Sequence, residues 1–150
     1  MNEETAVLTE SKVIGYVCDF LTKHNFSIKQ RLKETEKGID IIATTPDGSS
    51  SVAIEAKGEG SARVGSRRYG AVFTGNQVYD HVAKAFYCAV IRPKEGMLSG
   101  LAFPDNTHHH KQVNAILHAV KALDIEIFWV QQDGSVAVEG ASLWWQRHSK

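Results

Sequence analysis

Residues 38–58 have the sequence GIDIIATTPDGSSSVAIEAKG. At its centre, residues 46–49 (PDGS) combine a proline, an aspartate and a glycine, which is typical of a β-hairpin turn. The flanking residues 39–45 and 51–57 are mostly apolar or small. The stretch therefore predicts two antiparallel strands, and the position of the turn decides which residues face each other.

A two-residue type I′ loop at Asp47 and Gly48 would place Asp40 directly opposite Glu55. Because strand side chains alternate between two faces, Lys57 would share a face with Glu55. The other face of the hairpin would be apolar and would belong to the core. Its members would be Ile39, Ile41, Ala43, Val52, Ile54 and Ala56. The three charged residues would therefore form one cluster on the opposite face.

Two carboxylates in directly opposed strand positions repel each other, because their Cβ atoms lie only about 4.5–5.5 Å apart. Lys57 can supply one positive charge. A divalent ion such as Mg²⁺ supplies two, and typically takes one or two carboxylates together with water and phosphate oxygens. The alternative is a Glu55–Lys57 pair on a solvated sheet face, with Asp40 at its margin. Taken by themselves, the three residues leave both interpretations open.

The rest of the 150-residue chain alternates helical and strand patterns without a repeat or linker, which predicts one domain over residues 1–150. The element order is α-β-β-β-α-β-α-β-β, an α/β fold with a mixed sheet covered by helices. Helices are predicted at 9–25, 75–91 and 110–123, and further strands at 26–33, 97–103, 125–130 and 136–139. The strand at 26–33 carries lysines, as edge strands often do.

Composition narrows the function only slightly. Basic and acidic residues number 17 each, so the net charge does not indicate what kind of partner the protein binds. Residues 57–94, however, hold seven basic and only two acidic side chains. The two cysteines, Cys18 and Cys88, lack metal or redox spacing and are expected to be free thiols. No apolar run is long enough to span a bilayer. We expect an intracellular, cytoplasmic protein without a membrane partner.

The motif Gly38-Ile39-Asp40-Ile41, a turn, and Ile54-Glu55-Ala56-Lys57 resembles the active-site hairpin of the PD-(D/E)XK nuclease superfamily, which has the restriction-endonuclease-like fold and includes Holliday-junction resolvases. The predicted order α-β-β-β-α-β resembles the superfamily core and covers residues 9–103, with an α-β-β extension at the C-terminus. One departure is that Lys37-Gly38-Ile39 replaces the proline often found before the aspartate.

The resemblance implies a metal-dependent endonuclease that hydrolyses DNA phosphodiester bonds. Asp40 and Glu55 would be metal-ligating carboxylates, with the carbonyl of Ala56 as a further ligand for Mg²⁺ or Mn²⁺. Lys57 would orient or help to deprotonate the attacking water, or stabilise charge on the phosphate. A bound divalent metal both stabilises added negative charge and generates hydroxide near neutral pH.

Two further residues are candidates for the same site. Glu10 lies early in the first helix, where several branches of the family place an additional acid, but it would also favour the helix dipole. Gln77 opens the second helix, where some branches keep a polar residue facing the metal. Gln77, His81 and Lys84 fall on one helical stripe, for which a solvated face is the alternative.

DNA contacts are expected from the loop that follows the motif. Arg63, Arg67, Arg68 and Tyr69 combine phosphate-binding and stacking side chains, with Lys84 on the following helix. A flexible solvated loop is the alternative. The loop carries no visible code for sequence readout.

Other functions on the same fold stay open. A non-catalytic nucleic-acid-binding or assembly module would bind DNA without cleaving it, and a nuclease acting on RNA is a third possibility. The run His108-His109-His110 lacks the i, i+4 spacing of helical metal ligands and is predicted to be a polar helix start. Trp144 and Trp145 must pack on the sheet or on a second subunit, so a homodimer is possible.

Overall fold

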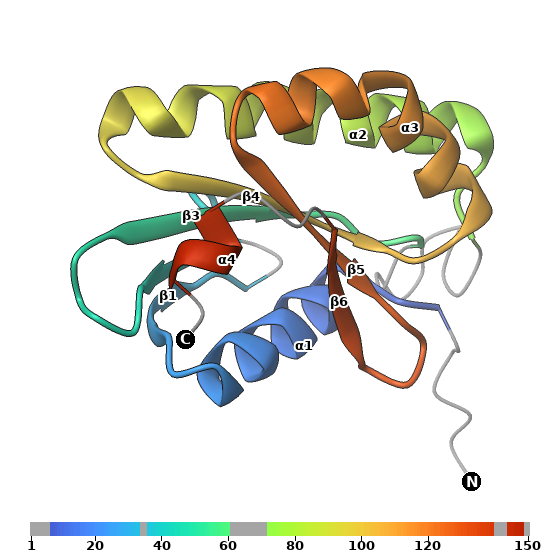
Figure 1. Ribbon diagram of the computed structural model, residues 1–150. Helices are drawn as coiled ribbons and strands as arrows, with labels where there is room; N and C mark the ends of the chain where they lie inside the picture. Colours follow the sequence, from blue (N-terminus) through green and yellow to red (C-terminus); the bar gives the residue numbers. More distant parts are fainter. Residues whose placement is uncertain (1–6, 34–35, 61–71, 140–143, 149–150) are drawn as a thin grey trace, which may run out of the picture.

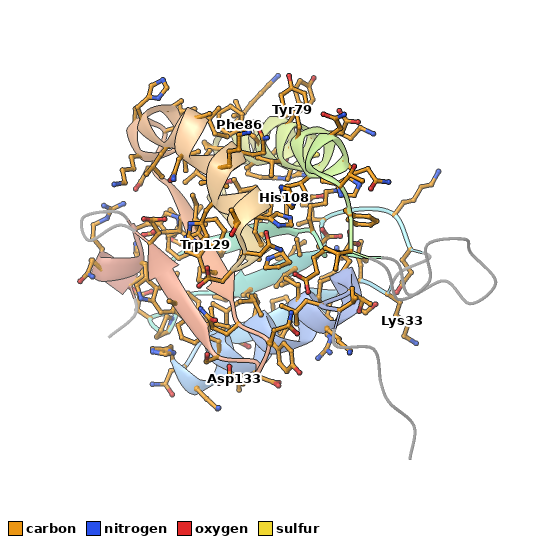
Figure 2. The ribbon with its side chains drawn as sticks, turned by 90° about the vertical axis from the view of Figure 1, so that its right-hand side faces the viewer. Lys33, Tyr79, Phe86, His108, Trp129 and Asp133 are labelled. Atoms are coloured by element: carbon orange, nitrogen blue, oxygen red, sulfur yellow. The ribbon has the colours of Figure 1, made fainter. Side chains whose placement is uncertain are left out.

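The computed structural model describes residues 7–33, 36–60, 72–139 and 144–148. They form an α/β fold in which a six-stranded mixed sheet is flanked by helices (Figure 1). The helices are α1 (Glu10–Lys23), α2 (Gly75–Ile91), α3 (Thr107–Ala122) and α4 (Trp144–His148), with a short 3-10 helix at Arg92–Glu95. The strands are β1 (Ser27–Arg31), β2 (Ile41–Thr44), β3 (Ser51–Ala56), β4 (Leu98–Pro104), β5 (Ile125–Val130) and β6 (Val136–Glu139).

The strands lie in the sheet in their chain order, β1 to β6. β3, β4 and β5 run parallel, whereas β1–β2, β2–β3 and β5–β6 are antiparallel pairs. β1 lies at an edge, as its lysine content predicted. α3 begins at Thr107, earlier than the predicted 110, because the Asn106 side chain accepts a hydrogen bond from His109 N and caps the helix there.

Each face of the sheet has its own hydrophobic core. Figure 1 shows α2 and α3 on one face and α1 on the other. The buried residues of α1, including Val13, Val17 and Leu21, pack against Ile41 and Ile54 of the hairpin. The second core joins α2 and α3 to β4 and β5. The predicted apolar face of the hairpin is therefore the α1 face, and its charged face is turned toward α2.

The register of the β2–β3 hairpin is the predicted one, since Ile41 pairs with Ile54 and Thr44 with Ser51. The predicted type I′ turn is wrong. Gly48 N donates to the Thr45 carbonyl over 2.8 Å, and Gly48 is the one residue of this turn with a positive φ, at 75°. Proline fixes a negative φ, which suits the first central position of a type I turn. The longer loop takes one more residue from each strand, Pro46 and Ser49, so the pairing is unchanged.

The C-terminal tryptophans pack back on their own chain. Trp144 is fully buried and its Nε1 donates to the Ser99 carbonyl over 2.8 Å. The ring of Trp145 stacks on Phe20 and Phe26, with centroid distances of 5.3 and 5.2 Å. These tryptophans therefore give no reason to expect a second subunit, and the homodimer remains a prediction.

Two smaller expectations concern the thiols and the membrane. Cys18 is a buried free thiol and Cys88 a half-buried one. Within the part of the chain that the structure describes, none of the helices has the length and apolar character that crossing a bilayer requires.

Gly58, directly after β3, is the point where the start of α1 meets the hairpin. A Cβ atom at this position would lie 2.4 Å from Glu10 N, 2.6 Å from the Thr9 carbonyl carbon and 2.8 Å from Leu8 O. These atoms belong to the backbone and cannot rotate away. Only glycine therefore allows α1 to begin so close to the end of β3.

We predict that Gly58→Ala lowers the free energy of unfolding by about 1–3 kcal/mol, because the added methyl group forces backbone to move. Gly15→Ala is the matched control. Within 4 Å its Cβ would meet the flexible guanidinium of Arg31, and alanine favours a helix by about 0.5–1 kcal/mol. Urea denaturation measures both variants. Equal stability of the two variants would contradict this account of the contact.

Candidate active site

Asp40 is fixed at the point where β2 begins. It is 8% exposed, and its Oδ2 accepts a hydrogen bond from Ala56 N over 2.9 Å. Its own carbonyl accepts from Leu32 N over 2.9 Å. The side chain of Gln30 donates to the preceding carbonyl of Ile39 over 2.8 Å. Backbone groups on both sides therefore hold the carboxylate against β3.

Glu55 lies one residue beyond the Ile41–Ile54 pair, opposite Asp40 as predicted. The two carboxyl groups lie close enough to shift each other's pKa. Burial and the charge of Asp40 raise the pKa of Glu55 to about 7. Burial also raises the pKa of Asp40, against the opposing effect of the Ala56 N–H.

Two positive charges lie near this pair. The charge of Lys57 lowers the pKa of both carboxyl groups, and Arg92 has the same effect to a smaller degree. Lys57 is half-buried at the end of β3. Arg92 follows α2 and also forms a 2.7 Å ion pair with Glu95. Sequence reasoning counted Arg92 as part of a basic segment but did not assign it to the site.

One face of α2 covers the charged cluster. Burial raises the pKa of Cys88, and the charges of Glu55, Lys57 and Asp40 also act on this thiol. Burial lowers the pKa of His81, and the charges of Lys57 and then Lys84 lower it further. The predicted stripe on this helix thus faces the hairpin, and it continues beyond Lys84 to Cys88.

Gln77 has a structural role in this arrangement. Its Oε1 accepts from Thr74 N over 2.8 Å, and its own N donates to the Thr74 hydroxyl over 3.4 Å. These two bonds form a capping box at the start of α2. A contact between Gln77 and a metal or substrate remains a prediction.

Glu10 is the first residue of α1, and its backbone lies against Gly58, next to Lys57 in the chain. The fold therefore brings the start of α1 to the same end of β3 that carries Glu55. The expected loop contacts from Arg63, Arg67, Arg68 and Tyr69 lie outside the described residues.

Glu59 is a buried carboxylate that sequence reasoning did not single out. It is 6% exposed and accepts three hydrogen bonds, from Leu8 N at 3.0 Å, Asn106 Nδ2 at 2.8 Å and Gln132 Nε2 at 2.7 Å. These donors come from the segment before α1, the start of α3 and the β5–β6 turn. No local pattern predicts Glu59, because its partners are 51, 47 and 73 residues away.

The Asp40–Glu55 pair suits a hard divalent cation. A divalent cation between the two carboxylates would balance both of their negative charges. Oxygen ligands favour Mg²⁺ or Mn²⁺ over softer metals. Among the described residues, no group of three or more His, Cys, Asp or Glu side chains could hold a metal. Further ligands would have to be the Ala56 carbonyl, water or substrate oxygens.

Comparisons with known proteins identify no family. No family model matches the chain, and no curated protein matches it. Among solved structures, it is similar to a FdxN element excision controlling factor protein from Anabaena variabilis, at 15% identity and a TM-score of 0.46. The match covers 84% of this chain and 95% of that one. Similarity at this level carries no argument about function.

The raised pKa of Glu55 predicts a pH-dependent stability in the absence of divalent cations. The folded state binds this proton more tightly than the unfolded state, so its stabilising effect is present at low pH and is lost as the pH rises through about 7. Glu55→Gln keeps a neutral side chain at every pH. Its stability relative to the wild type should therefore increase from acid to alkaline pH.

Urea denaturation at a series of pH values measures this difference. Glu126, whose pKa burial also raises to about 7, is present in both proteins, so its contribution cancels. A difference that stays constant across the pH range would show that Glu55 is not perturbed.

Proposed function

We propose that this protein is a metal-dependent DNA endonuclease of the PD-(D/E)XK superfamily. The observation that carries the proposal is the pair of opposed carboxyl groups of Asp40 and Glu55, beside Lys57 at the end of the β2–β3 hairpin. A solvated sheet face has no reason to keep two half-buried or buried acids in contact, because their burial and mutual repulsion are both unfavourable.

The order of elements supports the same proposal. α1-β1-β2-β3-α2-β4 has the order of the superfamily core, and β4 lies parallel to β3 after the α2 crossover. α3, β5 and β6 then correspond to the proposed C-terminal extension, and α4 adds to it. The restriction-endonuclease-like topology is therefore part of the proposal.

Each residue has a defined task in this scheme. Asp40 and Glu55 would hold Mg²⁺ or Mn²⁺, together with the carbonyl of Ala56. The ion would supply positive charge to the phosphodiester and lower the pKa of a bound water. The Ala56 N–H holds one oxygen of Asp40, leaving the rest of the carboxylate to bind. Lys57 would orient the attacking water and stabilise the developing negative charge.

Substrate binding would use the basic segment around the site. Lys84 is exposed on α2, near His81, and Arg92 lies near the two carboxyl groups. Together with Arg63, Arg67 and Arg68, they would contact the DNA backbone, whose phosphates attract Lys and Arg irrespective of sequence.

The proposal is tested by nicking of supercoiled plasmid DNA with Mg²⁺ or Mn²⁺. We expect the wild-type protein to cleave, and Asp40→Asn, Glu55→Gln and Lys57→Met to lose roughly 100-fold or more of the rate, as removal of a transition-state-stabilising group typically does. Asp133→Asn, in the β5–β6 turn, is the control that removes an acid elsewhere.

Two results would contradict the proposal. One is equal cleavage by the wild type and the three site variants, which would point to another active site. The other is DNA binding without cleavage under either metal, which would favour the non-catalytic binding module.

A further inference from the structure

Two histidines near the proposed site have buried ring nitrogens that find no hydrogen-bond partner among the described residues. These are Nδ1 of His81 on α2 and Nε2 of His109 on α3. Buried polar atoms in native proteins are nearly always paired, either with protein or with an ordered water. His109 is fully buried, so bulk solvent does not reach its ring.

The protonation of His109 follows from its surroundings. Its backbone N–H donates to Asn106 Oδ1 over 2.9 Å, and a backbone N–H can only donate, so Asn106 must turn its oxygen toward His109. The amide nitrogen of Asn106 then donates to Glu59 over 2.8 Å, which requires the same orientation. His109 Nδ1 lies 2.8 Å from that oxygen and must carry the proton.

His109 is therefore left with an unprotonated Nε2, which needs a donor. Burial lowers the pKa of His109 to about 4, so the ring is neutral at neutral pH and Nε2 keeps its lone pair. His81 lies close enough to His109 to lower its pKa, as His108 and His110 also do. The N-terminal turns of α2 and α3 lie side by side, because a Cβ on Gly75 would meet the ring of His108 at 3.4 Å.

His81 is also held in a defined orientation. Its ring packs edge-on against Phe73, with a centroid distance of 4.6 Å and an interplanar angle of 78°. The charged groups that act on it are Lys57, directly after β3, and Lys84 and Asp80 on α2. The neutral ring of His109 on α3 lies near it. If Nδ1 of His81 carries a proton, this buried and unpaired nitrogen can be the hydrogen-bond donor that Nε2 of His109 needs.

We propose that one buried water couples His81 and His109 through these two nitrogens, and that this coupling makes His81 a positioning residue for Lys57. With its proton on Nδ1, His81 presents Nε2 as an acceptor. The Lys57 ammonium group, whose charge acts on His81, or a water bound to it would donate to this acceptor. The buried hydrogen-bonded series Glu59–Asn106–His109 would thus fix which ring nitrogen of His81 carries the proton. The positioning role rests on the proposed nuclease function, whereas the coupling does not.

The coupling is tested by long-range ¹H–¹⁵N spectra of protein labelled with ¹⁵N-histidine at neutral pH, which report which ring nitrogen is protonated. We expect the Nδ1–H tautomer for both His81 and His109. His109→Gln should shift the His81 signals, and His81→Gln should shift those of His109. His81 is half-exposed, so the His81→Gln variant keeps the test valid if His109→Gln fails to fold.

His108→Gln is the matched control, because His108 belongs to the same run but is exposed. It should leave the His81 tautomer unchanged. An Nε2–H tautomer for His81, or His109 signals that are the same in His81→Gln as in the wild type, would overturn the coupling.

Cleavage kinetics test the positioning role separately. His81→Gln should lower kcat by roughly 10-fold to 100-fold, as small misplacements of catalytic groups do, without changing the Mg²⁺ concentration for half-maximal activity. His108→Gln should cleave like the wild type. Unchanged kcat in His81→Gln would overturn the positioning role alone. Absence of cleavage by the wild type would overturn the positioning role together with the proposed nuclease function. The spectra would still test the coupling between His81 and His109.

Discussion

The register between β2 and β3 is the constraint on which the site depends. With Ile41 opposite Ile54, the next position along brings Asp40 to Glu55, and the Asp40 carboxylate accepts from the Ala56 N–H over 2.9 Å. A shift by one residue would turn the charged side chains into the α1 core. The apolar side chains of the hairpin prevent that shift, because Ile41 and Ile54 are fully buried against α1. Core packing on one face thus specifies the chemistry of the other.

The site is assembled where several elements end. Asp40 precedes β2, Lys57 follows β3, and α1 begins directly against Gly58. Glu59 then connects the segment before α1 to the start of α3 and to the β5–β6 turn by three hydrogen bonds. Lys57 therefore lies between two fixed points, the end of β3 and this buried carboxylate. Such rigidity suits a residue that must hold a charge in place.

Much of the arrangement could be predicted from local patterns. Alternation in the hairpin and the Pro-Asp-Gly turn were enough for the register, although the turn type was wrong because Pro46 suits a type I turn. The start of α3 was placed too late, since apolar periodicity begins after the capping residue Asn106. The predicted extent of α2 was correct, because the apolar face of this helix is regular from Val78 to Ala89.

What could not be predicted depends on contacts between distant segments. Neither the hydrogen bonds of Glu59 nor the buried, unpaired ring nitrogens of His81 and His109 have a signature in local sequence. Arg92 lies beyond the last helical residue of α2, so its contribution to the carboxyl pair becomes visible only once the sheet and helix are packed.

The central claim is that Asp40 and Glu55 share one divalent cation. Anomalous diffraction from a crystal soaked with Mn²⁺ tests it most directly. We predict one strong anomalous peak in contact with carboxylate oxygens of both residues, and its loss in Asp40→Asn. A peak elsewhere, or a Glu55–Lys57 ion pair with no metal and Asp40 turned away, would contradict the account.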